Sequence, residues 1–183
     1  MAQKTKQEII TCFFEMLNTQ SFDKISIVSI SERCGINRNT FYYYFEDIYA
    51  MLVEALDSVL ASSEVGQKAR TWEEAFLMST EFGRKNRKVV YHLYYSNARE
   101  RVEQFLYDLA LSIMRPFVQS FPAAGKLEEE DRESFAIFCS SAIAALMVKW
   151  LRSGMNGDAE TEIRKFGGLM DHYVPIDTLR KES

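Results

Sequence analysis

Apolar residues recur every three or four positions along most of the chain, which is the spacing of amphipathic helices. The pattern predicts a helix over 5–18, two short helices between 26 and 45, and a longer helix over 47–63. No alternating apolar run flanked by hairpin turn residues is present, and only 8 Gly and 3 Pro interrupt the sequence. We therefore expect an all-α fold with about nine helices.

The turn between the two short helices is the most informative feature of the sequence. Gly35 follows the first helix and suits a left-handed C-cap, because it has no side chain to clash. Ser26 and Asn37 stand where the two helices begin, and each can accept a hydrogen bond from a free backbone N–H group. Phe41 and Phe45 are four residues apart and should face the core together. This outline is that of a helix-turn-helix, a motif that reads DNA.

The second short helix leaves polar and aromatic side chains on the side away from this core. Arg, Asn, Thr and Tyr side chains suit phosphates and base edges. Tyr43 has two readings, as buried support for the helix or as a contact to the DNA backbone. We expect the DNA-binding residues to be Lys24, Ser26, Asn37, Arg38, Asn39, Thr40, Tyr42, Tyr43 and Tyr44.

The segment SIVSISERCGINRNTFYYYFEDIYAML resembles the N-terminal domain of the TetR family of bacterial transcriptional regulators. The resemblance implies a helix-turn-helix domain over 1–46, and a ligand-binding and dimerisation domain over 47–183 that includes the joining helix at 47–63. It also implies a homodimer that binds near-palindromic operator DNA, acts as a repressor and is released by an unknown small-molecule effector. The segments FYYYFEDIYAML and WLRSGMNGDAETEI look like the subgroup that includes regulators of dihydroxyacetone kinase.

The charge of the N-terminal part is unusual for DNA binding. Residues 1–60 hold five Lys and Arg against eight Asp and Glu, and the whole chain has a formal net charge of −4. Non-specific attraction to phosphate should therefore be weak. Where the family commonly carries a phosphate-contacting Lys, this chain has Ile48. The following helix can offer its N-terminal N–H groups instead, although Glu46 and Asp47 oppose an approaching anion.

These features keep a second reading open, in which the chain is a ligand-binding or protein-interaction module of the same fold with weak or no DNA binding. An enzyme is a weaker reading, because the sequence has no glycine-rich phosphate loop and no spaced carboxylate cluster. Cys12, Cys34 and Cys139 are isolated from one another in the sequence, and there are only 2 His. We expect no catalytic residue, no metal site, no cofactor and no disulfide framework.

The remainder of the chain predicts five further helices, over 72–85, 87–95, 98–121, 128–152 and 158–173. The helix over 128–152 is apolar or small around much of its circumference, so it needs two burial partners. One is the core of its own domain, and the other is a second subunit in a four-helix bundle across a two-fold axis. The residues expected at this dimer interface are Ser141, Ala145, Val148, Ile163, Phe166 and Met170.

The aromatic cluster VVYHLYYSN at 89–97 has two readings. Its polar tips can line a ligand pocket, or its rings can be packing residues with their hydroxyl groups at the surface. Under the first reading, the ligand-binding residues are Phe76, Tyr91, His92, Tyr95, Phe105, Met114 and Phe138. A single His is more often hydrogen-bonded structure than a switch.

The longest uninterrupted apolar run, 142–148, is far shorter than a bilayer span. The first eight residues are polar and the next are amphipathic, which is unlike a secretion signal. We therefore expect a cytoplasmic protein without a membrane partner.

Overall fold

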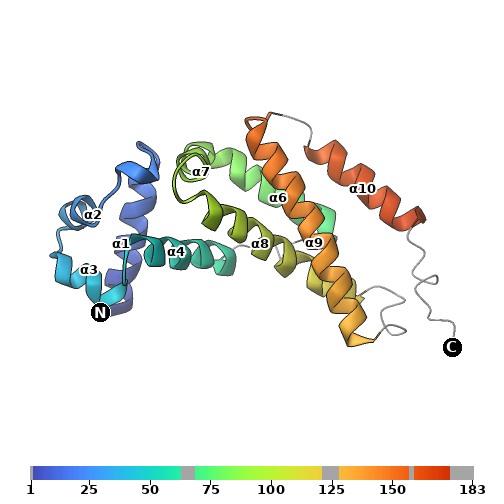
Figure 1. Cartoon of the computed structure of the whole chain (residues 1–183), viewed down its shortest axis with the longest axis horizontal. Coiled ribbons are helices and arrows are strands. Elements are labelled where there is room, and N and C mark those ends of the chain that lie inside the picture. The colour runs from blue at the N-terminus through green and yellow to red at the C-terminus, as the bar shows by residue number, and fades with distance from the viewer. Residues whose placement is uncertain (1, 63–68, 121–127, 157–158, 174–183) are drawn as a thin grey trace. The chain divides into compact units, whose positions relative to one another are not determined.

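The computed structural model describes residues 2–62, 69–120, 128–156 and 159–173. Every regular element in these ranges is a helix, so the predicted all-α fold is confirmed (Figure 1). The α-helices are α1 (Ala2–Leu17), α2 (Ile27–Cys34), α3 (Arg38–Tyr44), α4 (Ile48–Ser62), α6 (Trp72–Lys85), α7 (Arg87–Tyr94), α8 (Arg99–Ser120), α9 (Glu129–Arg152) and α10 (Ala159–Tyr173), and a short 3-10 helix, η1, spans Phe22–Lys24.

The chain divides into two compact units. Unit 1 comprises Met1–Ser63 and Lys85–Phe105, and unit 2 comprises Glu64–Arg84 and Leu106–Ser183. Unit 1 therefore adds α7 and the beginning of α8 to the four N-terminal helices, and the rest of α8 belongs to unit 2. The boundary between 46 and 47 that the sequence suggests stays a prediction.

The core of unit 1 is built from the apolar faces of α1, α3 and α4. Ile9, Phe13 and Leu17 repeat at helical spacing along α1 and are fully buried, as is Phe41 of α3. Phe22 of η1 extends this core, because its ring packs edge-on against Phe13 with 6.1 Å between the ring centroids. The helix-turn-helix thus rests on a continuous aromatic and aliphatic layer.

Polar contacts attach α7 and the start of α8 to α1, η1 and α4. The His92 ring nitrogen Nδ1 lies 2.6 Å from the Leu17 carbonyl oxygen, at the end of α1. The Asn97 backbone N–H donates to Asp23 Oδ1 of η1 at 3.0 Å. The Arg101 guanidinium lies over the Tyr49 ring, 4.2 Å from its centroid. These contacts join the α7–α8 corner to three elements of the N-terminal part.

Unit 2 is organised around α9, whose central residues are small or aliphatic. One side of the helix is buried by its own chain, through Ala136, Cys139, Ser140, Ile143, Ala144, Met147, Trp150 and Leu151. The opposite side leaves large apolar side chains at the surface, and Phe138 is 69% exposed. Apolar residues thus stand on the buried face and on the exposed face of α9. For this reason the helix shows little amphipathic bias in its sequence.

Helix α9 is also, among the described residues, long and apolar enough to cross a membrane, with a mean hydropathy of 1.7 over its most apolar window. Length and composition alone do not separate such a span from the core helix of a folded domain. The burial of one full side of α9 within unit 2 is the arrangement of a core helix.

Candidate nucleic-acid interface and ligand cavity

Side-chain caps at the starts of α2 and α3, and a left-handed glycine between the two helices, fix the helix-turn-helix. Ser26 Oγ accepts the Ser29 N–H at 3.1 Å while Ser29 Oγ accepts the Ser26 N–H at 3.0 Å, which is a reciprocal capping box at the start of α2. Gly35 ends α2 in the left-handed region, with φ +66°. Asn37 Oδ1 then accepts the Thr40 N–H at 2.8 Å and starts α3. The predicted caps and turn are confirmed.

Helix α3 separates core residues from surface residues as its sequence predicts. Phe41 and Phe45 are buried, whereas Tyr42 is 54% exposed and Tyr43 is 76% exposed. Tyr43 is therefore not buried support, and its ring instead packs edge-on against Tyr44, 4.9 Å away. The remaining predicted DNA-binding residues of α3 lie at or near this surface: Arg38 and Asn39 are exposed, and Thr40 and Tyr44 are half-buried.

Three of the predicted DNA-binding residues already have hydrogen-bond partners within the chain. The Ser26 hydroxyl is engaged in the capping box, the Asn37 side-chain oxygen Oδ1 holds the first turn of α3, and the Thr40 hydroxyl donates to the same Oδ1 at 3.2 Å. The amide NH₂ group of Asn37 is its remaining donor. Ser26 and Asn37 thus orient α2 and α3, and they can reach DNA only with the groups that the caps leave.

Few positive charges remain for phosphate on residues 2–62, the part of unit 1 that holds the helix-turn-helix. Arg33 pairs with Glu15 at 2.9 Å, and Lys6 pairs with Glu54 while lying over the Phe45 ring. Within residues 2–62, Lys24 and Arg38 form no ion pair, and nothing is described of the Lys4 side chain. Lys24 and Arg38 are therefore the cations of this segment best placed for a phosphate backbone.

The N-terminus of α4 is closed by its own chain. Asp47 Oδ1 accepts the N–H groups of Tyr49 and Ala50, each at 2.7 Å. The expectation that this helix offers free N–H groups to a phosphate is wrong for these two, because a carboxylate already holds them. Ile48, half-buried beside it, supplies no charge in compensation.

Unit 2 contains a cavity of about 300 Å³ between α6, α9 and α10. Its wall is mainly apolar and includes Trp150, whose indole Nε1–H is buried without an acceptor in the described structure. Unpaired buried donors are uncommon in folded proteins. The described lining residues are Phe76, Thr80, Ile143, Leu146, Met147, Lys149, Trp150, Ser153, Asn156, Ala159, Thr161, Glu162 and Ile163.

Of the seven residues predicted to bind a ligand, Phe76 lines this cavity and the other six are not among its described lining residues. His92 is bonded to the Leu17 carbonyl, which fits the structural reading of that residue. Tyr91 and Tyr95 stack on each other at 5.3 Å. Met114 is fully buried, Phe138 is exposed and Phe105 is half-buried. The sequence missed Trp150 and Ile143, which lie on the buried side of α9.

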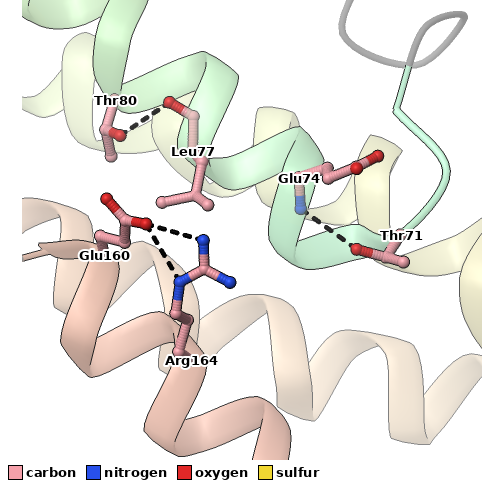
Figure 2. Close-up of polar contacts among 6 residues, drawn as sticks. All are labelled: Thr71, Glu74, Leu77, Thr80, Glu160 and Arg164. Carbon is pink, nitrogen blue, oxygen red and sulfur yellow. Dashed lines mark hydrogen bonds and ion pairs between the residues drawn. The ribbon is translucent and has the colours of Figure 1, made fainter.

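A second hollow of about 520 Å³ lies between α6 and α10 and is lined by Leu77 and Met78 together with five charged or polar residues, Glu74, Thr80, Glu81, Arg84 and Glu160. Figure 2 shows that several of its polar groups are engaged locally. Arg164 Nε and Nη2 donate to Glu160 at 3.0 and 2.7 Å, and Thr80 Oγ1 donates to the Leu77 carbonyl at 2.9 Å (Figure 2). The Glu74 N–H likewise donates to Thr71 Oγ1 at 3.2 Å. The first cavity is the better ligand candidate because its wall is more apolar.

The predicted dimer residues differ in exposure, and one of them is not described. Ser141 and Ala145 are exposed on α9, beside Ile137 and Phe138, which the prediction did not include. Val148 and Phe166 are half-buried, and Phe166 packs against Trp72 with ring centroids 5.8 Å apart. Ile163 is only 7% exposed, so its own subunit already covers it. The Met170 side chain lies outside the described residues.

Comparison with known proteins matches both halves of the chain to regulators. Residues 14–55 match the family described as bacterial regulatory proteins, tetR family, and residues 70–172 match the transcriptional regulator C-terminal region. No curated protein matches the sequence. The matched families are of transcriptional regulators, a class that is generally not enzymatic.

The solved structures that share the fold include those of the following two proteins. The dihydroxyacetone kinase operon activator DhaS is 15% identical with a TM-score of 0.63, over 91% of this chain and 93% of that protein. NalD of Pseudomonas aeruginosa, the secondary repressor of the MexAB-OprM multidrug efflux pump, is 16% identical with a TM-score of 0.57, over 97% of both chains. At such low identity, these similarities show the fold alone.

Proposed function

The chain belongs to the TetR family of bacterial regulatory proteins, and we propose that it is a cytoplasmic transcriptional regulator that binds double-stranded operator DNA through α3. The observation that carries the proposal is the exposed face of α3. Arg38, Asn39 and Tyr42 stand on a helix whose position is fixed by caps on both sides of the Gly35 turn. Side chains of these types bind phosphates and base edges in the major groove.

The regulator acts as a homodimer in this proposal. Helix α9 exposes Ile137, Phe138 and Ala145 on the side that its own subunit does not cover. A second copy of α9 and α10 would bury this surface in an isologous four-helix interface. Two copies of α3 about 34–36 Å apart would then reach successive major grooves on one face of DNA, so the operator is near-palindromic.

A small-molecule effector releases the DNA in this proposal, and the cavity between α6, α9 and α10 is its candidate site. The effector must bind the two states of the dimer with different affinity, because equal affinity shifts no equilibrium. We propose repression relieved by the effector as the direction of control. The solved structures of this fold include both an activator and a repressor, so the fold supports either direction.

The test is a pull-down of sheared genomic DNA from the source organism with the purified protein, at low and at moderate salt. The Arg38→Ala, Tyr42→Ala double variant is compared with an Arg164→Ala, Tyr95→Ala variant, which removes the same residue types from exposed positions outside α3. Enrichment of a few near-palindromic fragments by the wild type and the control variant, but not by the α3 variant, is the expected result. Equal enrichment by all three proteins would refute the role of α3.

The second candidate function is a ligand-binding or protein-interaction module without DNA binding. Asp47 favours it, because its carboxylate closes the N-terminus of α4 and adds negative charge where a phosphate would approach. No enrichment by any of the three proteins at either salt concentration would support this function.

Effector binding is measured by tryptophan fluorescence in a Trp72→Phe variant, because the chain has 2 Trp and this change leaves Trp150 alone. The first probes are naphthalene and 2-naphthol, since a cavity of about 150 Å³ holds benzene and this one is larger. Saturable changes that disappear when Ala159→Phe fills the cavity are expected. Unaltered binding in the filled variant would place the ligand elsewhere.

A further inference from the structure

The wall of the cavity between α6, α9 and α10 changes in character along α9. Ile143 and Met147 line the cavity from the second half of this helix. Lys149 of its last turn and Ser153, directly after it, are the next polar lining residues. Helix α10 adds Glu162 from its first turn. Much of the wall is thus apolar, and the polar groups gather where α9 ends and α10 begins.

Two opposite charges stand among these polar groups. Lys149 of α9 and Glu162 of α10 are both exposed, and neither forms an ion pair in the part of the chain that the structure describes. A charged ligand group would be attracted by one of them and repelled by the other, and solvent screens both interactions. Removing an ion from water to lie against an apolar wall costs more than such exposed charges return. The cavity therefore favours an uncharged ligand.

Among the uncharged polar lining residues, Asn156 differs from Thr80 and Ser153 in the state of its side chain. The Thr80 hydroxyl donates to the Leu77 carbonyl at 2.9 Å (Figure 2). The Ser153 hydroxyl donates within its own turn, to backbone carbonyl oxygens that lie 2.8 and 2.7 Å away. The Asn156 carboxamide is exposed and forms no hydrogen bond with another described residue. It offers a donor and an acceptor to a ligand.

We propose that this cavity selects uncharged amphiphiles, which are molecules with an apolar body and a hydrogen-bonding group that pairs with the Asn156 carboxamide. The inference deepens the proposed function and rests on it, because it names the class of effector for the same cavity. A cavity of about 150 Å³ holds benzene, and this one, at about 300 Å³, has room for a second ring and a short polar group.

The two parts of the wall reject different molecules. An uncharged hydroxyl or carbonyl group regains at Asn156 the hydrogen bond that it gives up in water, whereas a hydrocarbon has nothing to offer the carboxamide. The apolar side chains of α6 and α9 reject ions, because they return none of the lost hydration. Pockets that are mainly apolar with a few polar groups orient their ligands in this way.

The experiment is equilibrium dialysis of the full-length protein at pH 7 against four compounds with the same naphthalene ring. They are 2-naphthalenemethanol, its apolar isostere 2-ethylnaphthalene, 2-naphthoate and 2-naphthylmethylammonium. The alcohol is expected to bind saturably, and at least about tenfold more tightly than either ion. Ala159→Phe places a large side chain in the cavity wall and is expected to abolish this binding.

Asn156→Leu tests the polar contact, since it removes the carboxamide at nearly constant size. It is expected to lower the ratio of the alcohol affinity to the 2-ethylnaphthalene affinity by about fivefold, which is the effect of one hydrogen bond. The matched control is Asn97→Leu, which removes the same exposed residue type from unit 1. This variant is expected to keep the wild-type ratio.

Three results would overturn the proposal. Either ion could bind as tightly as the alcohol, the affinity ratio could stay unchanged in Asn156→Leu, or the wild type could show no saturable binding of the alcohol. The assay contains no DNA, so its failure is distinct from a failure of operator binding. An alcohol that binds in the cavity without releasing operator DNA would refute the effector role and leave the ligand class standing.

Discussion

Gly35 and Gly168 offer a sharp test of the physical account, because the same substitution is expected to have opposite effects at the two sites. A Cβ atom added at either glycine meets nothing within 4 Å, so neither substitution creates a clash. The two sites differ in backbone conformation. Gly35 has φ +66° at the end of α2, whereas Gly168 lies within α10.

The magnitudes follow from this difference. Alanine in the left-handed region costs roughly 1–2 kcal/mol, so Gly35→Ala should lower the free energy of unfolding by about that amount. Asn tolerates the same region better, so Gly35→Asn should cost clearly less. Within a helix, alanine is favoured over glycine by up to about 1 kcal/mol. Gly168→Ala should therefore leave the free energy of unfolding unchanged or raise it, and the gain is smaller if the end of α10 frays.

The assay is urea unfolding followed by far-ultraviolet circular dichroism. With an m-value of about 2 kcal/mol/M, the Gly35→Ala change should move the midpoint down by roughly 0.5–1 M. Trp72 and Trp150 both lie in unit 2, so tryptophan fluorescence reports separately on that unit. An equal cost for Ala and Asn at position 35, or a loss at Gly168 as large as at Gly35, would refute the reasoning from backbone conformation.

Three further predictions follow from the same structure. Phe41→Ala should lower the free energy of unfolding by about 3–5 kcal/mol in urea, because it empties a fully buried site. Asp47→Ser keeps a cap for α4 but removes a charge, so operator DNA should bind several-fold more tightly in a low-salt binding titration. The Arg115 guanidinium lowers the pKa of Glu133 in the folded protein. The Arg115–Glu133 pair therefore stabilises the fold fully above the unfolded-state pKa of Glu, and this stabilisation is lost as pH falls through the lower folded-state pKa. Glu133→Gln should therefore weaken the acid dependence of unfolding between those two values.

The parts of the fold that the sequence predicted are those fixed by local chemistry. The caps at Ser26 and Asn37 and the left-handed turn at Gly35 each depend on backbone groups within three residues. Helical spacing likewise placed Phe41 and Phe45 in the core. Such signals act over one or two turns, so a single sequence contains all the information that they need.

The candidate ligand cavity could not be predicted in the same way, because it depends on how helices pack. His92 looked like a possible pocket residue, but α7 places its ring against the carbonyl of Leu17. Trp150 looked like one more apolar position on α9, and only the packing of α6 and α10 shows that its indole N–H is buried without a described acceptor. Helical periodicity indicates which side of a helix is apolar, but not which neighbour covers it.

The distribution of charge on residues 2–62, which hold the helix-turn-helix, limits the phosphate contribution to any affinity for DNA. Arg33 and Lys6 are neutralised by carboxylates of the same unit, and α4 is capped by Asp47. If Lys24 and Arg38 are the phosphate-binding cations, a dimer neutralises about four phosphates, and the logarithm of affinity should fall with the logarithm of salt concentration with a slope near −3.6. A measured slope this shallow would mean that the aromatic and amide groups of α3, and the proposed pairing of two subunits on one operator, contribute most of the binding. Loss of the α3 side chains should therefore weaken operator binding far more than loss of Lys24.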